Sequence, residues 1–319
     1  MAVGGVFAGV ERWTHPSVIL VATNLSDLDR LMPLAFRMAG ETGARLLLLN
    51  VLPATASLTV DVTGMPYYDP AGAMESARKA LEPWCERARG AGITCEGLVR
   101  EGYAAQEIIS AVRQFRADRL ILGTRSRSKL GKLLLGSVAE QVLRSVYLPV
   151  ITVGPEAHLP AESGDRVKTI LLATTLGETS RPSAALACQV AARQHAHLVL
   201  LHILPPIDEM ERKGLPTGLD SAAMHELRRL AAETSADCCT EIAAKVLHGN
   251  PAIEILAEAA ACQASLIILG ATHRSAFENL TRDRTVYRVL AHARCPVLTL
   301  RTPDAALAHS ESETAAARV

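Results

Sequence analysis

The chain carries one stretch of sequence twice. Residues 120–153 (LILGTRSRSKLGKLLLGSVAEQVLRSVYLPVITV) and 267–300 (IILGATHRSAFENLTRDRTVYRVLAHARCPVLTL) have the same order of apolar, glycine-containing and helix-like segments. Three anchor pairs keep a common spacing of about 147 residues. The pairs are Gly102 with Gly249, Gly123 with Gly270, and Pro149 with Pro296. Because the anchors stay in register, the 319 residues are predicted to form two related domains, each long enough to bury its own core.

Strand-like and helix-like segments alternate in both halves. The apolar runs at 17–23 (SVILVAT) and 45–51 (RLLLLNV) are typical of parallel strands that helices cover on both faces. Between them, an S-x-x-D sequence at 26–29 and apolar residues at helical spacing predict a helix that ends by Gly43. The same order recurs from Thr169 onward. The predicted fold class is α/β, with two tandem open, mostly parallel five-stranded sheets and helices on both faces of each.

These elements predict domains at residues 1–154 and 167–302. Residues 155–166 have the Pro, Gly and charged composition of a linker, and the Ala, Ser and Glu-rich residues 303–319 are expected to be a disordered tail. The apolar N-terminus is short and has no basic start, so we expect no signal peptide. No apolar run approaches membrane-spanning length, and a cytoplasmic location is expected.

Composition argues against several kinds of partner. The 33 basic and 33 acidic residues balance, so no overall field attracts nucleic acid or a membrane surface. Only 3% of the residues are aromatic, which leaves few platforms for stacking single-stranded bases. The seven cysteines show no CxxC and no Cys/His ligand spacing. We interpret them as reduced, small apolar residues and predict no metal site.

A candidate anion site lies in the first half, at the carboxyl ends of the predicted strands. Ligands of open parallel sheets bind where the direction of the crossovers switches, and residues 22–24, 50–51 and 123–137 should meet there. Gly123 is expected to leave its strand with positive φ, and Gly136 to let the backbone come close to a ligand. Asn50 and His202, aligned by the repeat, are interpreted as packed, hydrogen-bonded residues at strand ends.

The segment between the two glycines is basic. Ser137 follows and is predicted to open a helix whose unpaired N–H groups attract anions, although Ser137-x-x-Glu140 also fits a capping box. A phosphate chain would gain charge-assisted hydrogen bonds from some of the cations, while a solvated basic loop is the alternative for any single one. The cations are Arg125, Arg127, Lys129 and Lys132.

These residues resemble the universal stress protein family, in its tandem two-domain form. The resemblance rests on VATNLS at 21–26, on the pattern G-x2-(G)-x9-G-S at 123–137, and on PVITV at 149–153. It covers about residues 17–153 and 168–301. The resemblance implies an adenine nucleotide alpha hydrolase-like fold and ATP, with or without Mg²⁺, bound by the first domain. It also implies a stress-response or signalling role, an internal pseudo-dimer paired through the last strands, and further homodimerisation.

The resemblance assigns nucleotide contacts position by position and assigns no catalytic residue. Asn24 stands where the family usually has Asp, but its oxygen can still accept an adenine amino proton. Ser126 stands where the family has a second glycine, and its β-carbon resists positive φ. The predicted nucleotide-binding residues are Ala22, Thr23, Asn24, Val51, Gly123, Arg125, Ser126, Arg127, Gly136, Ser137 and Val138.

The second half departs further from the family pattern. Thr175, His273, Asp283 and Arg284 replace the Asp, the second and third glycines and the Ser of the motif. The Asp283 carboxylate should repel phosphate at a helix start, which predicts one nucleotide site per chain. Two alternatives remain open. One is slow ATP hydrolysis, with the basic loop stabilising charge on the γ-phosphate, although no residue is an obvious water-orienting base. The other is a scaffold in which both sites are degenerate. The sequence does not identify a protein partner.

Overall fold

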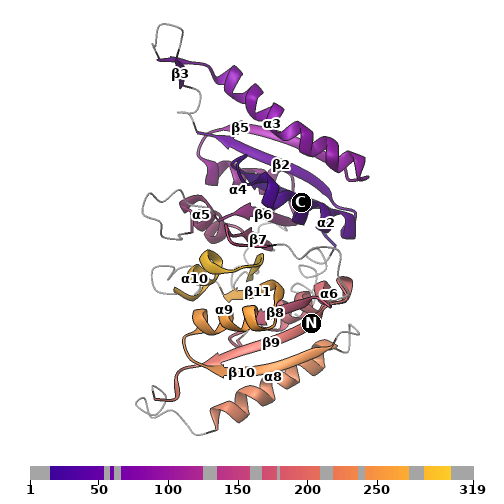
Figure 1. Cartoon of the computed structure of the whole chain (residues 1–319), viewed down its shortest axis with the longest axis vertical. Helices are drawn as coiled ribbons and strands as arrows, with labels where there is room; N and C mark the ends of the chain where they lie inside the picture. Colours follow the sequence, from indigo (N-terminus) through magenta and orange to yellow (C-terminus); the bar gives the residue numbers. More distant parts are fainter. Residues whose placement is uncertain are drawn as a thin grey trace, which may run out of the picture. The chain divides into compact units, whose positions relative to one another are not determined.

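The computed structural model of the chain describes residues 15–53, 58–60, 66–124, 135–158, 167–177, 180–208, 218–235, 241–272 and 284–302. The chain divides into two compact units, residues 1–159 and 160–319. In each unit, helices cover a parallel sheet (Figure 1). The predicted α/β fold class is confirmed. Within the described part of the chain, no helix combines the length and apolar character needed to cross a membrane.

In the first unit, the described strands follow the order β7-β6-β1-β2-β5, and every neighbouring pair is parallel. The strands are β1 (Val18–Thr23), β2 (Arg45–Leu52), β5 (Cys95–Glu101), β6 (Arg119–Gly123) and β7 (Val150–Val153). The helices are α2 (Leu28–Thr42), α3 (Pro70–Gly90), α4 (Ala104–Gln114) and α5 (Ser137–Ser145). Right-handed crossovers place α2 and α3 on one face of the sheet and α4 and α5 on the other. β1 is buried along its whole length, as its continuous apolar run predicts.

The segment between β2 and α3 differs from the prediction. Its Pro, Gly and Tyr residues predict a loop that leads to a helix near Ser76, but the segment contains an antiparallel pair, β3 (Leu58–Val60) with β4 (Pro66–Tyr68). α3 also starts earlier, because the Asp69 carboxylate accepts a hydrogen bond from Gly72 N at 2.8 Å and Pro70 occupies the first turn. Asp followed by Pro is a typical helix start.

The second unit repeats this topology, with the strand order β10-β9-β8-β11-β12. Its strands are β8 (Thr169–Ala173), β9 (His197–Leu204), β10 (Ile242–His248), β11 (Ala264–Thr272) and β12 (Val297–Thr302). Its helices are α6 (Ser180–Arg193), α8 (Leu219–Ser235), α9 (Pro251–Ala261) and α10 (Arg284–His292). The bounds of α5 and α10 differ by the spacing of about 147 residues that the anchors predict.

One anchor pair of the repeat has a clear backbone cause. After β5 the chain turns at Gly102 with φ +149°, and after β10 it turns at Gly249 with φ +145°. Residues with a β-carbon rarely adopt this region, so glycine is required at both turns. Each turn leads directly into a helix of the face opposite α2 or α6.

The interpretation of the cysteines is correct for some and wrong for one. Cys85, Cys95, Cys262 and Cys295 are free thiols, and all except Cys262 are buried. Cys188 is disulfide-bonded, which contradicts the prediction that every cysteine is reduced. The described residues contain no group of three or more His, Cys, Asp or Glu side chains able to hold a metal ion.

Candidate functional site

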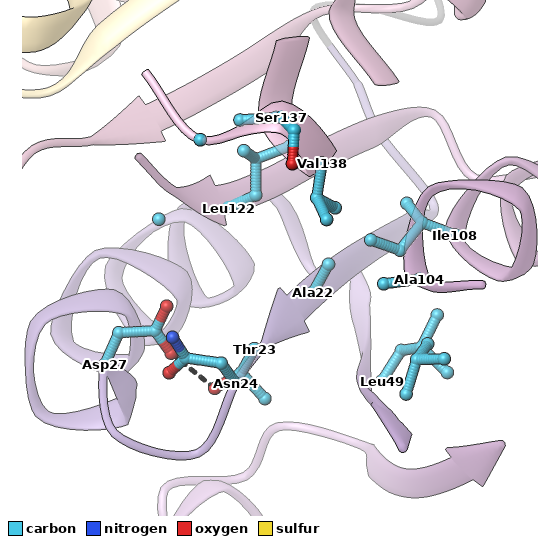
Figure 2. A pocket seen from close by; sticks show the side chains of 14 residues that line it. Ala22, Thr23, Asn24, Asp27, Leu49, Ala104, Ile108, Leu122, Ser137 and Val138 are labelled. Carbon is cyan, nitrogen blue, oxygen red and sulfur yellow. Dashed lines mark hydrogen bonds between the residues drawn. The ribbon is translucent and has the colours of Figure 1, made fainter. Parts of the chain in front are cut away.

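A cavity of about 250 Å³ opens in the first unit at the carboxyl ends of β1, β2 and β6 (Figure 2). This is the place where the crossovers change direction, and where open parallel sheets bind ligands. The described residues predicted to bind nucleotide all line it: Ala22, Thr23, Asn24, Val51, Gly123, Gly136, Ser137 and Val138. The predicted contacts Arg125, Ser126 and Arg127 lie outside the described residues. The cavity brings in further residues that sequence reasoning missed: Asp27, Leu49, Ala104, Ile108, Leu122 and Ala139.

One end of the cavity is apolar. Leu49 of β2 and Ala104 and Ile108 of α4 lie together there, away from the polar side chains of Asn24 and Asp27 (Figure 2). The turn at Gly102 starts α4 beside the ends of β1 and β2. Apolar side chains like these do not differ in sequence from core residues, so only the topology could identify them as lining a site.

The opposite side of the cavity contains the start of α5. Gly136 is the N-cap, with φ −65° and ψ 144°, and no described side chain caps the helix. The hydrogen bond from Glu140 N to Gly136 O, at 2.9 Å, closes the first turn. The N–H groups before Glu140 therefore have no partner within the helix. A helix start left open in this way suits an anion.

The predicted capping box is wrong. Ser137 is the first helical residue, and Gly136 occupies the N-cap position. The Ser137 side chain is exposed. The Glu140 carboxylate instead accepts a hydrogen bond from Arg144 Nη2 at 2.7 Å, one helical turn along. Without the box, the backbone at the helix start stays available to a ligand.

Gly123 is required for space rather than for positive φ. It ends β6 in regular parallel register with Val153 and is not among the glycines with positive φ. A β-carbon at this position would lie 2.5 Å from the Asp27 Oδ2 atom, closer than packed atoms approach. The expectation of positive φ at Gly123 is therefore wrong, and the carboxyl group of Asp27 fills the space that the missing side chain leaves.

Asp27 is the main polar residue that sequence reasoning missed. It precedes α2 as its N-cap but makes no side-chain cap, because its Oδ1 accepts a hydrogen bond from the Thr23 hydroxyl at 2.5 Å. The side chain is only 4% exposed, and this burial raises the pKa of Asp27 above its usual value. The position of Asp27 before the apolar residues of α2 indicates a helix cap, but it does not predict the direction of the carboxyl group.

Asn24 is exposed and uses its side-chain oxygen locally. Asn24 Oδ1 accepts hydrogen bonds from Ser26 N at 3.0 Å and from Ser26 Oγ at 2.8 Å. Two donors already use the lone pairs of this oxygen. In this arrangement the oxygen expected to accept an adenine amino proton is engaged in its own turn.

Two buried oxygens beside the cavity have no hydrogen-bond partner within the part of the chain that the structure describes. Thr124 follows Gly123, is 2% exposed, and has an unpaired Oγ1, while its carbonyl accepts from Gly136 N at 3.3 Å. Asn50 Oδ1 is also unpaired, although Asn50 Nδ2 donates to Thr23 O at 2.9 Å, as expected of a packed strand-end residue. Buried polar atoms are normally paired, so this region suits a ligand with donor groups.

Gly123→Ala should destabilise the first unit by about 1–3 kcal/mol, because the added methyl group and the Asp27 carboxyl compete for one space. In an Asp27→Ser background the same substitution should cost clearly less, because the shorter side chain leaves room. Chemical denaturation of the four proteins in this double-mutant cycle gives the coupling. Equal costs in both backgrounds would mean that the two residues do not oppose each other.

The second unit builds the equivalent turn with different side chains. Leu25 and Leu176 both have positive φ, 71° and 59°, and the N–H of each bonds to the hydroxyl of the threonine two residues earlier. His202 Nδ1 lies 2.8 Å from Thr174 O, and in the first unit Asn50 Nδ2 lies 2.9 Å from Thr23 O. The Thr174 hydroxyl meets Ser180, the first residue of α6, with the two oxygens 2.7 Å apart, as the Thr23 hydroxyl meets Asp27.

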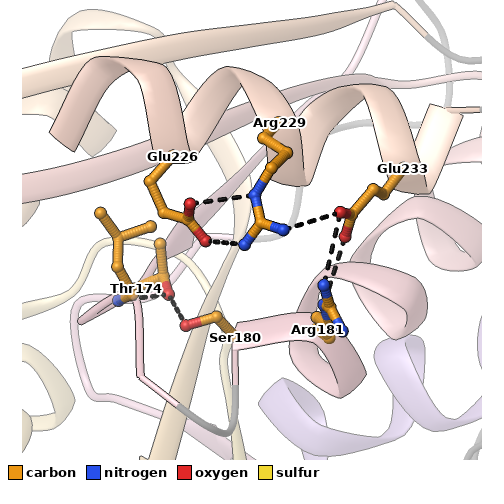
Figure 3. A network of polar contacts seen from close by, with 7 residues as sticks. Thr174, Ser180, Arg181, Glu226, Arg229 and Glu233 are labelled. Carbon is orange, nitrogen blue, oxygen red and sulfur yellow. Dashed lines mark hydrogen bonds and ion pairs between the residues drawn. The ribbon is translucent and has the colours of Figure 1, made fainter. Parts of the chain in front are cut away.

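Nearby, the second unit has a cavity of about 370 Å³ whose charged side chains pair with one another (Figure 3). Arg229 bonds to both Glu226 and Glu233, and Arg181 Nε lies 3.2 Å from Glu233 Oε2. Of the residues that break the family motif here, Thr175 is exposed beside this turn. His273 and Asp283 lie outside the described residues, and α10 starts at Arg284.

Comparison with known proteins agrees with this architecture. The model of the universal stress protein family matches residues 17–154 and 166–301. A universal stress protein of Mycolicibacterium smegmatis is 24% identical over 307 residues, which cover 92% of this chain and 99% of that protein.

One solved structure gives the same result for the fold over most of the chain. A universal stress protein from Archaeoglobus fulgidus aligns with a TM-score of 0.66 and 22% identity, over 90% of this chain and 97% of that one. A universal stress protein family protein from Arabidopsis thaliana with AMP bound aligns with 43% of this chain and 91% of its own, at 21% identity and a TM-score of 0.30. The family model matches nearly the whole described chain, in two copies. The chain therefore belongs to the universal stress protein family and contains two domains of that family in tandem.

Proposed function

We propose that the first domain binds ATP and that the chain is a nucleotide-dependent stress-response or signalling factor. The observation that carries the proposal is the cavity between β1, β6 and the start of α5, which has one apolar end and one open helix N-terminus. The adenine base of ATP would fit the apolar end, and its phosphate chain would fit the open helix N-terminus. The expected cytoplasmic location and further homodimerisation belong to the same proposal.

The apolar end suits the base. Leu49 and Ile108 are buried and Val51 is partly buried, so they offer an apolar surface that a purine would cover. The unpaired oxygens of Asn50 and Thr124 lie next to cavity residues and are acceptors for amino or hydroxyl protons of a nucleoside.

The opposite side suits phosphate. The N–H groups at the start of α5 and the positive end of its dipole face the cavity through Gly136 and Ser137. Residues 125–134, which join Gly123 to this helix, contain four cations in the sequence. A Mg²⁺ ion would arrive with the triphosphate and reduce its charge.

Replacement of the four cations by glutamine should weaken ATP binding more than about tenfold, because each charge-assisted hydrogen bond contributes about 1.5–3 kcal/mol. Adenosine, which lacks phosphate, should bind nearly unchanged. The loss for ATP should shrink as salt is added. Calorimetric titration with both ligands at two salt concentrations measures this. The substituted residues are Arg125, Arg127, Lys129 and Lys132.

A matched control removes the same charge from exposed positions outside the cavity lining. The control substitutes glutamine for Arg45, Arg78, Lys79 and Arg89, all of which are exposed. If the control lowers ATP affinity as much as the loop variant, the effect is one of overall charge. If the loop variant weakens adenosine and ATP equally, the loop serves the structure and does not hold phosphate.

A further inference from the structure

The turn after β1 does not require an acidic partner for its threonine hydroxyl. In the second unit, Ser180 bonds to Thr174 and supports the same turn with a neutral side chain. In the first unit, Asp27 bonds to Thr23 in the same manner. The two halves thus supply an internal comparison. A serine is sufficient for the turn, so the acidic group needs another explanation.

The carboxyl of Asp27 lies where a ligand of the cavity would meet it. Asp27 is one of the residues that line the cavity, and its Oδ2 occupies the space beneath Gly123. Figure 2 shows Asp27 at the polar end, beside Asn24 and away from Ile108. A ligand group lying against Gly123 would therefore face this carboxyl directly.

The surroundings of Asp27 shift its protonation equilibrium towards the neutral acid. Burial is the main cause that raises the pKa of Asp27 above its usual value. Hydrogen bonds from the Thr23 hydroxyl and the Asn24 backbone, and the charge of Arg30, oppose the rise but are smaller. Arg30 directs Nη1 to Gly154 O at 3.2 Å, and no ion pair joins it to Asp27 among the described residues. On the β6 side the neighbour is Gly123, which carries no charge.

We propose that Asp27 is a further ligand-binding residue, which donates a hydrogen bond from its neutral carboxyl to a phosphate oxygen of the nucleotide at Gly123, so that nucleotide binding takes up a proton. This rests on the proposed function of the first domain. An ionised Asp27 would instead place two negative groups side by side in a partly buried site. Only the protonated form offers a donor to an anionic oxygen.

The direction of the pH dependence follows from linkage. The bound nucleotide holds the proton on Asp27 and raises its pKa further, so affinity rises as pH falls between the pKa of the free protein and that of the complex. The limiting slope is about tenfold in affinity per pH unit for one proton taken up. In the free protein, the raised pKa means that the neutral form of Asp27 stabilises the folded state. This stabilisation is lost as pH rises through the folded-state pKa.

Asp27→Asn tests this, because the amide keeps an acceptor for Thr23 and a donor for the ligand but carries no charge. ATP, ADP and adenosine would be titrated by calorimetry into the full chain, from about pH 5 to about pH 8, in buffers of differing ionisation enthalpy. Protonation of the nucleotide itself is common to both proteins and cancels in their ratio. We expect the variant to bind ATP about tenfold more tightly than the natural chain at the high end of the range, with no gain for adenosine. It should also take up fewer protons.

Asp27→Ser, which also removes the charge, should likewise lose the pH dependence, but without the tighter ATP binding expected of the amide. Unfolding midpoints without ligand should favour the asparagine variant increasingly as pH rises. The proposal is overturned if the natural chain binds ATP and Asp27→Asn leaves the pH profile and proton uptake unchanged, or weakens ATP and adenosine alike. If the natural chain binds neither ligand at any pH, the proposed function itself fails, and this inference with it.

Discussion

Gly136→Asp should lower the ATP affinity of the first domain by about a hundredfold to a thousandfold. A carboxylate about 4 Å from a phosphate, at an effective dielectric constant of about 20, costs about 4 kcal/mol. The substitution also brings in an N-cap side chain that accepts hydrogen bonds from the N–H groups that phosphate would use. It thus reproduces the Asp that the second half has at position 283.

The fold should tolerate this change. Gly136 has φ −65° and ψ 144°, which any residue adopts, and Asp is among the preferred N-cap residues. The unfolding midpoint should therefore stay the same or rise, while calorimetry shows the loss of ATP binding. Adenosine should be affected far less, because it has no phosphate to be repelled.

Gly136→Asn is the matched control. Asparagine caps a helix as well as aspartate does but carries no charge, so it separates competition for the N–H groups from charge repulsion. We expect an intermediate loss of ATP affinity. If Gly136→Asp leaves ATP affinity at the level of the natural chain, the nucleotide binds elsewhere.

Much of the fold could be predicted because its signals are local or repeated. β1 and the central part of β2 are buried on both faces, so their apolar runs are continuous and visible in the sequence. Gly102 and Gly249 mark equivalent turns because both require positive φ. The register of the repeat then predicts the same order of elements in the second unit, and α10 follows α5 by the expected spacing.

The site was predictable only in part, because several residues near it have more than one local role. Glu140 has both the spacing of a capping box and that of an i, i+4 ion pair, and it pairs with Arg144. Asp27 has the position of a helix cap, but its carboxyl bonds to Thr23 within the cavity. Ile108 was indistinguishable from a core residue until the topology placed α4 beside β1 and β2. These choices depend on tertiary contacts that no short pattern contains.

The repeat raises the question of how many nucleotides one chain binds. Duplication alone predicts two, but the second half has lost four motif positions, among them the third glycine, replaced by Asp283. If each loss costs only about 1 kcal/mol and the losses add, the second site is weaker by several hundredfold.

Calorimetric titration of the intact chain with ATP and Mg²⁺ tests the central claim most directly. We expect saturation at one ATP per 319-residue chain, and loss of that single binding event in Gly136→Asp. Two equivalent binding events per chain, or one event that Gly136→Asp leaves intact, would contradict the assignment of the nucleotide to the first domain.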